Sequence, residues 1–163
     1  MFKINLGSFL ERTEFRFDLK KDEINFGNDL LIYDKLMVNL ILTKQEEGII
    51  LVQGELKCEI KMECSRCLDK FNYDIETDFT VLFKKKDLYN DEDVESGILF
   101  YDKNEIELFD YIRETLLLEM PIKPLCNENC KGLCSICGTN LNKKQCNCKI
   151  DTGNNPFKFL EIK

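Results

Sequence analysis

The sequence predicts an α+β fold: an antiparallel β-rich sheet or partly open barrel, one main helix, and a cysteine-rich zinc-knuckle segment at the C-terminal end. Three observations predict it. Apolar and polar residues alternate over two long central stretches, an apolar stripe with helical spacing follows at 105–120, and six cysteines crowd into 126–148. We expect a β-rich core with one helix over 1–120 and a zinc-binding segment over 121–163, packed together as a single structural domain.

The N-terminal third contains the signals of two strands. Phe15 and Phe17 flank Arg16, which indicates one short strand, and the stretch from Leu36 to Leu42 indicates another. Apolar residues occupy both parities of the second stretch, so we expect it to be buried on both faces. A turn is predicted at 46–48, where two glutamates precede a glycine.

The clearest pattern is an alternation that runs from 50 to 64 and resumes from 71 to 83. Apolar residues and cysteines hold the even positions of the first stretch, with Gly54 among them, and polar side chains hold the odd ones from 53 onward. Such alternation is typical of long strands with one wet face. We therefore predict two antiparallel strands joined at a turn that contains Cys64 and Cys67. Cys58 falls on the apolar parity and is predicted to be a small buried hydrophobe.

A charged stretch and a helix are predicted next. The glycine-containing region 84–104 is expected to be an exposed loop, and its acids at 87–95 either form a solvated linker or dock on a basic protein. A helix is predicted over 105–120, ended by Pro121. Its apolar stripe recurs at steps of three and four residues and consists of Ile106, Phe109, Ile112, Leu116 and Met120. A short terminal element is expected at 157–162.

Composition limits the classes of function. The 163 residues carry a net charge of −7, so bulk electrostatics give no attraction to a phosphate backbone. The charge is uneven, because 84–119 contains eleven acids and five bases whereas 121–150 contains five lysines and one acid. The chain contains no histidine, the commonest general base, and no nucleophile-elbow or phosphate-loop motif, so we expect no enzyme.

The cellular compartment follows from two further features. No apolar run approaches the ~20 residues of a membrane span, so no membrane partner is expected. The first ten residues lack the pattern of a signal peptide. We therefore expect a reducing cytoplasm, where disulfides are rare, and this favours metal binding for the cysteines.

Eight of the nine cysteines have the spacing of metal ligands. C-x-x-C pairs let two thiolates of one tight turn reach the same zinc ion, and such pairs occur at Cys64/Cys67 and Cys134/Cys137. With no histidine available, one or two zinc ions would be held by thiolates alone. The predicted ligands are Cys64, Cys67, Cys126, Cys130, Cys134, Cys137, Cys146 and Cys148.

The grouping of these ligands is open at this point. We prefer one ion on the four cysteines from 134 to 148, because the loop between them is short, and a second ion on the remaining four. Alternatively, the four cysteines from 126 to 137 share one ion, or only one site is occupied. A redox pair at Cys64/Cys67 and an iron–sulfur cluster are weaker alternatives.

These residues resemble the YceD family of large ribosomal RNA subunit accumulation proteins. The resemblance is carried by Cys64-Ser65-Arg66-Cys67-Leu68, by L-L-L-E-M-P from Leu116, and above all by C-K-G-L-C-S-I-C-G-T-N-L-N from Cys130 to Asn142. It implies a non-enzymatic ribosome-biogenesis factor that supports processing and accumulation of large-subunit (23S) ribosomal RNA. The implied partner is precursor RNA or an early pre-ribosomal large-subunit particle.

The residues that would touch RNA are basic side chains in or beside the knuckles. A compact zinc knuckle can display such side chains to RNA, although lysines on exposed loops also serve only to solvate them. The candidates are Arg66, Lys123, Lys131, Lys143, Lys144 and Lys149. The alternative function is a zinc-stabilised protein-interaction adaptor without direct RNA contact.

Overall fold

The computed structural model describes residues 3–7, 11–20, 32–46, 48–91, 93 and 96–149. The chain forms two compact units. The first comprises Met1–Met62 and Asn72–Ile122, and the second comprises Glu63–Phe71 and Lys123–Lys163. The turn of the central strand pair therefore belongs to the same unit as the cysteine-rich segment.

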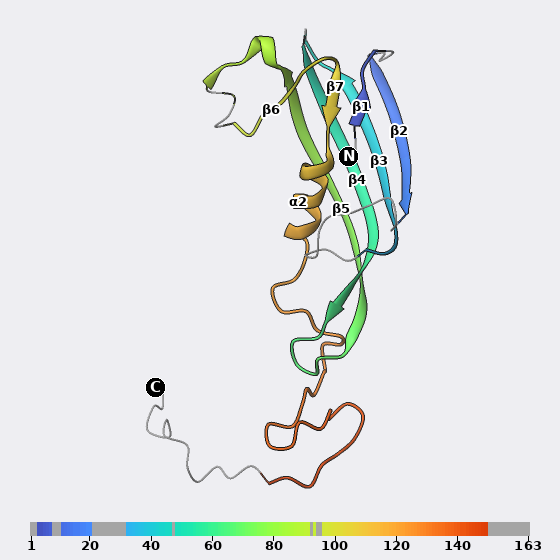
Figure 1. Ribbon diagram of the computed structural model, residues 1–163, viewed down its shortest axis with the longest axis vertical. Helices are drawn as coiled ribbons and strands as arrows, with labels where there is room; N and C mark the ends of the chain where they lie inside the picture. The colour runs from blue at the N-terminus through green and yellow to red at the C-terminus, as the bar shows by residue number, and fades with distance from the viewer. Residues whose placement is uncertain are drawn as a thin grey trace. The chain divides into compact units, whose positions relative to one another are not determined.

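In the described part of the chain, one open sheet of five strands dominates the first unit (Figure 1). Its order is β2-β3-β4-β5-β6, with antiparallel pairing of β2 with β3 and of β3 with β4, and a parallel pairing of β5 with β6. The strands are β2 (Arg12–Lys20), β3 (Ile32–Lys44), β4 (Ile49–Glu63), β5 (Lys70–Lys85) and β6 (Leu99–Tyr101). The predicted fold class, a β-rich α+β fold with a sheet that does not close, is confirmed.

The alternation of the sequence builds the inner face of this sheet. Leu36 on β3 lies opposite Cys58 on β4, and Val38 lies opposite Leu56; all four are buried. Gly54 lies opposite Leu40, and a Cβ atom at position 54 would fall 2.3 Å from the ring of Phe79. The absence of a side chain at 54 is thus what lets this ring of β5 lie across β4.

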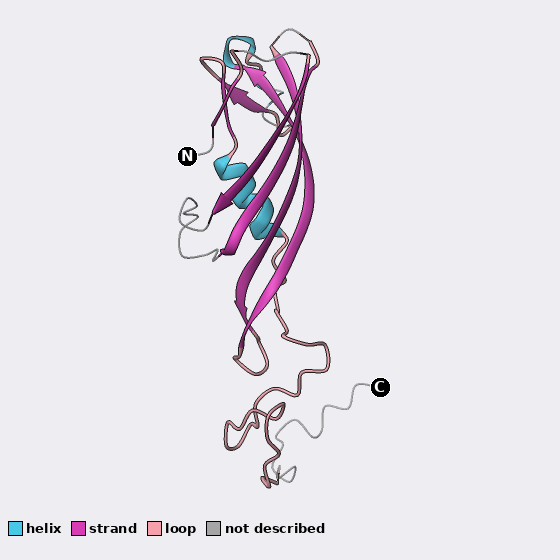
Figure 2. Ribbon diagram, turned by 90° about the vertical axis from the view of Figure 1, so that its right-hand side faces the viewer, coloured by secondary structure: helices cyan, strands magenta, loops and turns pink. Residues whose placement is uncertain are grey.

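The helix α2 (Phe109–Leu118) covers the inner face, as Figure 2 shows. Its Tyr111 ring meets Phe79 edge-on with ring centroids 5.2 Å apart, and Ile112 and Leu116 are buried. In the described residues, β1 (Lys3–Asn5) and β7 (Glu105–Glu107) form a small second sheet in which Ile4 lies opposite Ile106. The core thus lies between the large sheet, the helix and this small sheet.

The predicted helix start at 105 was wrong. Residues 102–105 form a tight turn in which Lys103 and Asn104 have φ values of 49° and 57°, a backbone typical of two-residue hairpin turns. This turn directs 105–107 into β7, and α2 begins only at Phe109. The predicted loop 84–104 was also partly wrong, because it contains the end of β5, the 3₁₀ turn η2 (Lys86–Leu88) and β6.

The outer face of the sheet is polar, which corrects the expectation that the stretch 36–42 is buried on both faces. Met37, Asn39 and Ile41 are only half-buried, and Asn39 donates a hydrogen bond to Glu55 at 3.0 Å. The strand predicted around Phe15 and Phe17 is present as β2, and the rings of these two residues are stacked. The predicted terminal element at 157–162 lies outside the described residues.

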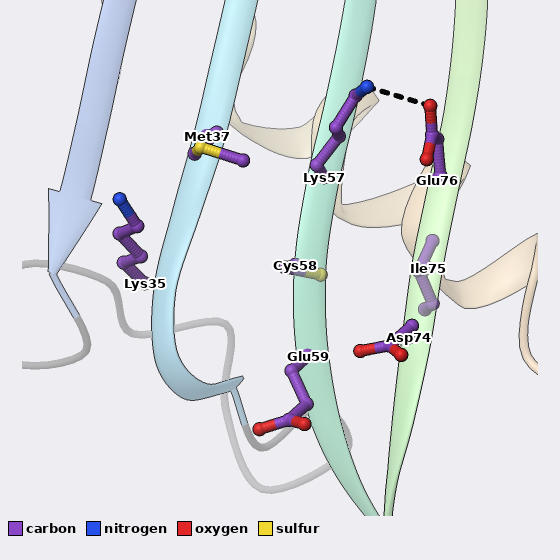
Figure 3. A pocket seen from close by; sticks show the side chains of 8 residues that line it. All are labelled: Lys35, Met37, Lys57, Cys58, Glu59, Asp74, Ile75 and Glu76. Carbon is purple, nitrogen blue, oxygen red and sulfur yellow. Dashed lines mark ion pairs between the residues drawn. The ribbon is translucent and has the colours of Figure 1, made fainter.

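A shallow hollow of about 400 Å³ lies on this outer face (Figure 3). Its lining is mostly the charged side chains of this face, and Lys57 binds Glu76 across it at 2.7 Å. Lys57 also binds Glu55, and Glu59 accepts a hydrogen bond from Asn72. Three of the five charged side chains that line the hollow are therefore already held by neighbouring side chains on an open surface.

Candidate metal centre

The eight clustered cysteines all lie in the second unit, and the structure brings their sulfur atoms together in two groups of four. Within each group, all sulfur atoms lie within 4.8 Å of one another. The first cysteine group is Cys64, Cys67, Cys126 and Cys130, and the second cysteine group is Cys134, Cys137, Cys146 and Cys148. This is the grouping preferred from the sequence, and it differs from the alternative that joins the four cysteines from 126 to 137.

The sulfur–sulfur distances suit a tetrahedral ion. Cys64 Sγ lies 3.7 Å from Cys130 Sγ, and Cys67 Sγ lies 3.6 Å from Cys126 Sγ. A zinc tetrahedron with Zn–S bonds of ~2.3 Å has edges of about 3.8 Å, whereas a disulfide requires about 2.05 Å. All nine cysteines lie in described residues, and each is a free thiol. The donor set therefore fits a soft-ligand, four-coordinate ion.

The first knuckle is a tight turn that aims Cys64 and Cys67 at one point. The N–H of Cys64 donates to the carbonyl of Asp69 at 3.0 Å, and the N–H of Leu68 donates to the carbonyl of Cys64 at 2.9 Å. The N–H of Arg66 points at Cys64 Sγ at 3.5 Å. Leu68 follows the second cysteine with φ 61°.

The second knuckle repeats this backbone. The N–H of Cys134 donates to the carbonyl of Thr139 at 2.8 Å, and the N–H of Gly138 donates to the carbonyl of Cys134 at 2.9 Å. Gly138 has φ 70°, and the hydroxyl of Thr139 lies 3.1 Å from Cys137 Sγ. Two C-S-x-C sequences thus produce the same turn, each with a left-handed residue directly after the second cysteine.

Arg66 joins the first knuckle to the segment that supplies the other two sulfurs of its group. Its Nη1 donates to the carbonyls of Cys130 at 2.9 Å and of Glu128 at 3.2 Å. Its own carbonyl accepts from the N–H of Leu133 at 3.1 Å. Gly132, with φ 72°, passes so close that a Cβ there would lie 3.0 Å from the Arg66 oxygen. The predicted RNA-contact residue Arg66 therefore has a structural role within the unit.

A second set of contacts comes from Asn140 and Asn142, which were not among the predicted site residues. Asn142 donates from Nδ2 to Cys130 Sγ at 3.2 Å and to Asn140 Oδ1 at 3.0 Å. Asn140 donates from Nδ2 to Asp69 at 2.9 Å, and Lys143 binds the other oxygen of that carboxylate at 2.8 Å. The sequence did contain a pointer to both asparagines, since they belong to the G-T-N-L-N string that carries the family resemblance.

The two groups differ in exposure. Cys64, Cys67 and Cys130 are 0%, 3% and 5% exposed and form a small buried cluster. The half-buried side chains of Phe71, Leu125 and Leu133 pack against it. In the second cysteine group, Cys137 and Cys148 are exposed. Three of the four cysteines of the first group are therefore shielded by apolar neighbours and only Cys126 is exposed, whereas none of the four in the second group is buried.

Each group contains at least one thiol whose pKa is lowered beside others whose pKa is raised. Hydrogen bonds, the largest from the backbone of Cys126, lower the pKa of Cys64 to about 6, and the bond with Thr139 is the main cause that lowers the pKa of Cys137 to about 6. Desolvation raises the pKa of Cys126 to about 12, and the hydrogen bond with Cys137 raises that of Cys148 to about 12. Four sulfurs this close cannot all ionise without a cation among them.

The remaining predicted RNA-contact residues are lysines on the surface of the second unit. Lys143 is paired with Asp69, as above. Lys123, Lys131, Lys144 and Lys149 are exposed, and among the described residues no ion pair involves them. By sequence, the second unit contains nine bases and five acids, whereas the first contains fourteen bases and twenty-five acids. The side-chain charge of the chain is thus +4 in one unit and −11 in the other.

Comparison with known proteins identifies what this chain is similar to. A family model described as "Large ribosomal RNA subunit accumulation protein YceD" matches residues 52–162. That range contains β5, α2 and both cysteine groups. No solved structure matches. Among the described residues, no helix has both the length and the apolar character needed to cross a membrane.

Curated relatives extend the comparison. A protein of Arabidopsis thaliana named "Large ribosomal RNA subunit accumulation protein YCED homolog 1, chloroplastic" is 26% identical over 139 residues, covering 67% of this chain and 43% of the relative. The protein of the same name from Zea mays is 25% identical over 145 residues, covering 70% and 48%. An uncharacterized protein of Mycobacterium tuberculosis is 32% identical over 119 residues, covering 71% and 57%. The chain spans about half the length of the curated relatives it matches.

Proposed function

This chain belongs to the YceD family, and we propose on that premise that it is a non-enzymatic ribosome-biogenesis factor. It supports the processing and accumulation of large-subunit (23S) ribosomal RNA in the cytoplasm. Its partner is precursor RNA or an early pre-ribosomal large-subunit particle. The name of the family and the names of the plant relatives support the link to large-subunit RNA.

The observation that carries the molecular part of the proposal is the pair of four-thiol groups in the second unit. Each group holds one zinc ion, with the eight cysteines of the two groups as ligands. Bound zinc supplies structural cross-linking: it joins the turn at 63–71 to the segment that follows α2, two regions about sixty residues apart in sequence. The ions also neutralise thiolates that would otherwise repel each other.

RNA contact is proposed for the lysines beside the knuckles rather than for the sheet. The first unit carries a side-chain charge of −11, which repels a phosphate backbone. Eight thiolates and two Zn²⁺ ions add a formal charge of about −4 to the second unit, so its positive potential is confined to side chains that point away from the metal. The main RNA contacts are the exposed lysines Lys123, Lys131, Lys144 and Lys149. Arg66 and Lys143 contribute to RNA binding only with the donors that their structural contacts leave unused.

Crosslinking with matched variants tests this proposal. Lys123, Lys144 and Lys149 are changed together to glutamine, and the control changes three exposed lysines of the first unit, Lys35, Lys44 and Lys86, in the same way. Ultraviolet crosslinking in cells should recover large-subunit precursor RNA with the wild type and the control, and much less with the knuckle variant. Equal recovery with both variants would reject the lysine surface.

A second function is favoured by the acidity of the first unit. With a charge of −11, this unit suits a basic protein partner such as a ribosomal protein, and the chain would then act as a zinc-stabilised adaptor without RNA contact. Within 87–95, Asp93 is already held by Lys84 at 2.7 Å, so any docking there falls to its neighbours. The adaptor function predicts that the protein recovers ribosomal proteins but gives no RNA crosslink. It also predicts normal sedimentation in large-subunit precursor fractions.

A further inference from the structure

We infer that Asn140 and Asn142 couple the two cysteine groups, so that metal binding at either group strengthens binding at the other. The inference rests on the proposed zinc sites. Both asparagines lie in the loop between Cys137 and Cys146, which is the loop that a metal ion in the second cysteine group would close. Their side chains, however, contact the first cysteine group and its knuckle.

Both the oxygen and the nitrogen of the Asn142 side-chain amide make hydrogen bonds. Its Oδ1 accepts the N–H of Lys131 at 2.8 Å, and its Nδ2 donates to Asn140 Oδ1 and to Cys130 Sγ. An amide N–H directed at a sulfur stabilises the thiolate, the form that binds a metal ion. Because the amide is held by Lys131 and Asn140, its donor is aimed at Cys130 once this loop is ordered.

Asn140 connects the same loop to the other half of the first cysteine group. Its backbone pairs with Leu133 next to the second knuckle, and its Nδ2 donates to Asp69. The carbonyl of Asp69 in turn accepts the N–H of Cys64 and so closes the first knuckle. Lys143 binds the second oxygen of Asp69, so that side chains within 140–143 reach both the first knuckle and Cys130.

The coupling arises because the contacts of Asn140 and Asn142 form only when the loop that carries them has a fixed backbone. Without an ion in the second cysteine group, the loop 138–145 lacks one of its anchors, and fixing its backbone costs conformational entropy. An ion bound by the second group removes that cost, so the asparagines are already in place when the first group binds its ion. Linkage makes the effect reciprocal.

A metal-binding cycle tests the inference. Zinc affinity of the first cysteine group is measured by competition with a chromophoric chelator, and native mass spectrometry counts the bound ions. The second group is disabled by Cys146→Ser and Cys148→Ser, in the wild-type and Asn142→Ala backgrounds. We expect disabling the second group to weaken the first about 10-fold in the wild type, and Asn142→Ala alone to weaken it about 10-fold. In the Asn142→Ala background, disabling the second group should then have little further effect.

Three variants separate hydrogen-bond donation from shape and folding. Asn142→Asp keeps an acceptor for Lys131 but directs a carboxylate at Cys130, and it should weaken the first group more than Asn142→Ala does. The side chain of Asn140 bonds Asp69 rather than a sulfur atom, yet Asn140→Ala should still reduce the coupling. Asn147→Ala, at an exposed position between Cys146 and Cys148, is the matched control and should keep wild-type affinity.

The outcomes are distinguishable. Wild-type affinity in Asn142→Ala, or an equal effect of the two serine changes in both backgrounds, would overturn the coupling while leaving two bound ions and the proposed function intact. A wild-type protein that carries no metal ion would remove the zinc sites themselves and the inference with them. Far-ultraviolet circular dichroism identifies any variant that does not fold, and Asn140→Ala then decides the question.

Discussion

Leu68 and Gly138 occupy the same place in two knuckles that share their backbone hydrogen bonds, with φ values of 61° and 70°. A left-handed backbone suits glycine, whereas it costs a leucine about 1–2 kcal/mol. The first knuckle therefore contains strain that the second avoids. Leu68 is also 57% exposed, so its side chain recovers little of this cost by burial.

Exchanging these residues should have opposite effects on stability. Leu68→Gly relieves the strain but increases the freedom of the unfolded chain, and we expect a net gain of about 0.5 kcal/mol. Gly138→Leu introduces the strain and should destabilise by about 1–2 kcal/mol. Chemical denaturation at constant metal loading measures both changes. A loss of stability in Leu68→Gly would mean that the leucine side chain makes a contact that offsets its backbone cost.

Arg66→Ala should weaken metal binding in the absence of any RNA. The change removes the Nη1 donor from the carbonyls of Cys130 and Glu128, so the segment bearing Cys130 loses its tie to the first knuckle. We expect about a 10-fold lower zinc affinity of the first cysteine group. Arg66→Lys should recover only part of it, because one ammonium lacks the fixed fork of a guanidinium. Unchanged affinity together with reduced RNA crosslinking would assign Arg66 to RNA instead.

Cys58 should be the slowest of the nine cysteines to alkylate once chelation has loosened the second unit and exposed its eight clustered thiols. It is 8% exposed on the inner face of β4, and burial raises its pKa to about 11. The thiolate is the reactive form, so at pH 8 only a small fraction of Cys58 is available, and its rate should rise steeply as the pH approaches 11. Timed alkylation with peptide mass spectrometry measures each site. Equal rates at all nine sites would contradict the burial of Cys58.

Gly54→Ala should destabilise the first unit by about 1–3 kcal/mol, because the added methyl group overlaps the ring of Phe79. The neighbouring pair offers a rescue. Phe79→Leu makes room beside position 54, so the double variant should be less destabilised than the sum of the two single changes. Urea unfolding gives the three values. Strict additivity would show that the ring and the methyl group do not meet.

Chelation of metal should loosen the second unit and spare the first. The first unit has its own apolar core, including Leu36, Val38 and Leu56, whereas the described residues of the second have only a small cluster around three cysteines. Hydrogen exchange should therefore accelerate at 63–71 and 123–149 on chelation, with amides of β3 and β4 between 36 and 60 remaining protected. Cys58→Ala, as a control, should leave the ion count unchanged.

The strands β4 and β5 could be predicted from sequence because their alternation continues over fifteen and sixteen residues. C-x-x-C spacing and loop length favoured the observed grouping of the cysteines but left the alternatives open, because spacing alone does not say which pairs meet in space. β7 could not be found in this way: three residues are too few to show a period, and Ile106 fits the helical stripe equally well. The network around Cys130 was also out of reach, since Asn140 meets Asp69 across 71 residues of sequence.

The unequal shielding of the two cysteine groups sets an order in which the protein responds to chemical stress. Oxidants and competing chelators reach Cys137 and Cys148 at the surface, whereas in the first cysteine group only Cys126 is exposed and apolar side chains close off Cys64, Cys67 and Cys130. With the proposed zinc ions bound, we expect damage to start at the second cysteine group, so that a form retaining only the ion of the first group precedes complete loss. Reductant and fresh zinc should restore that form.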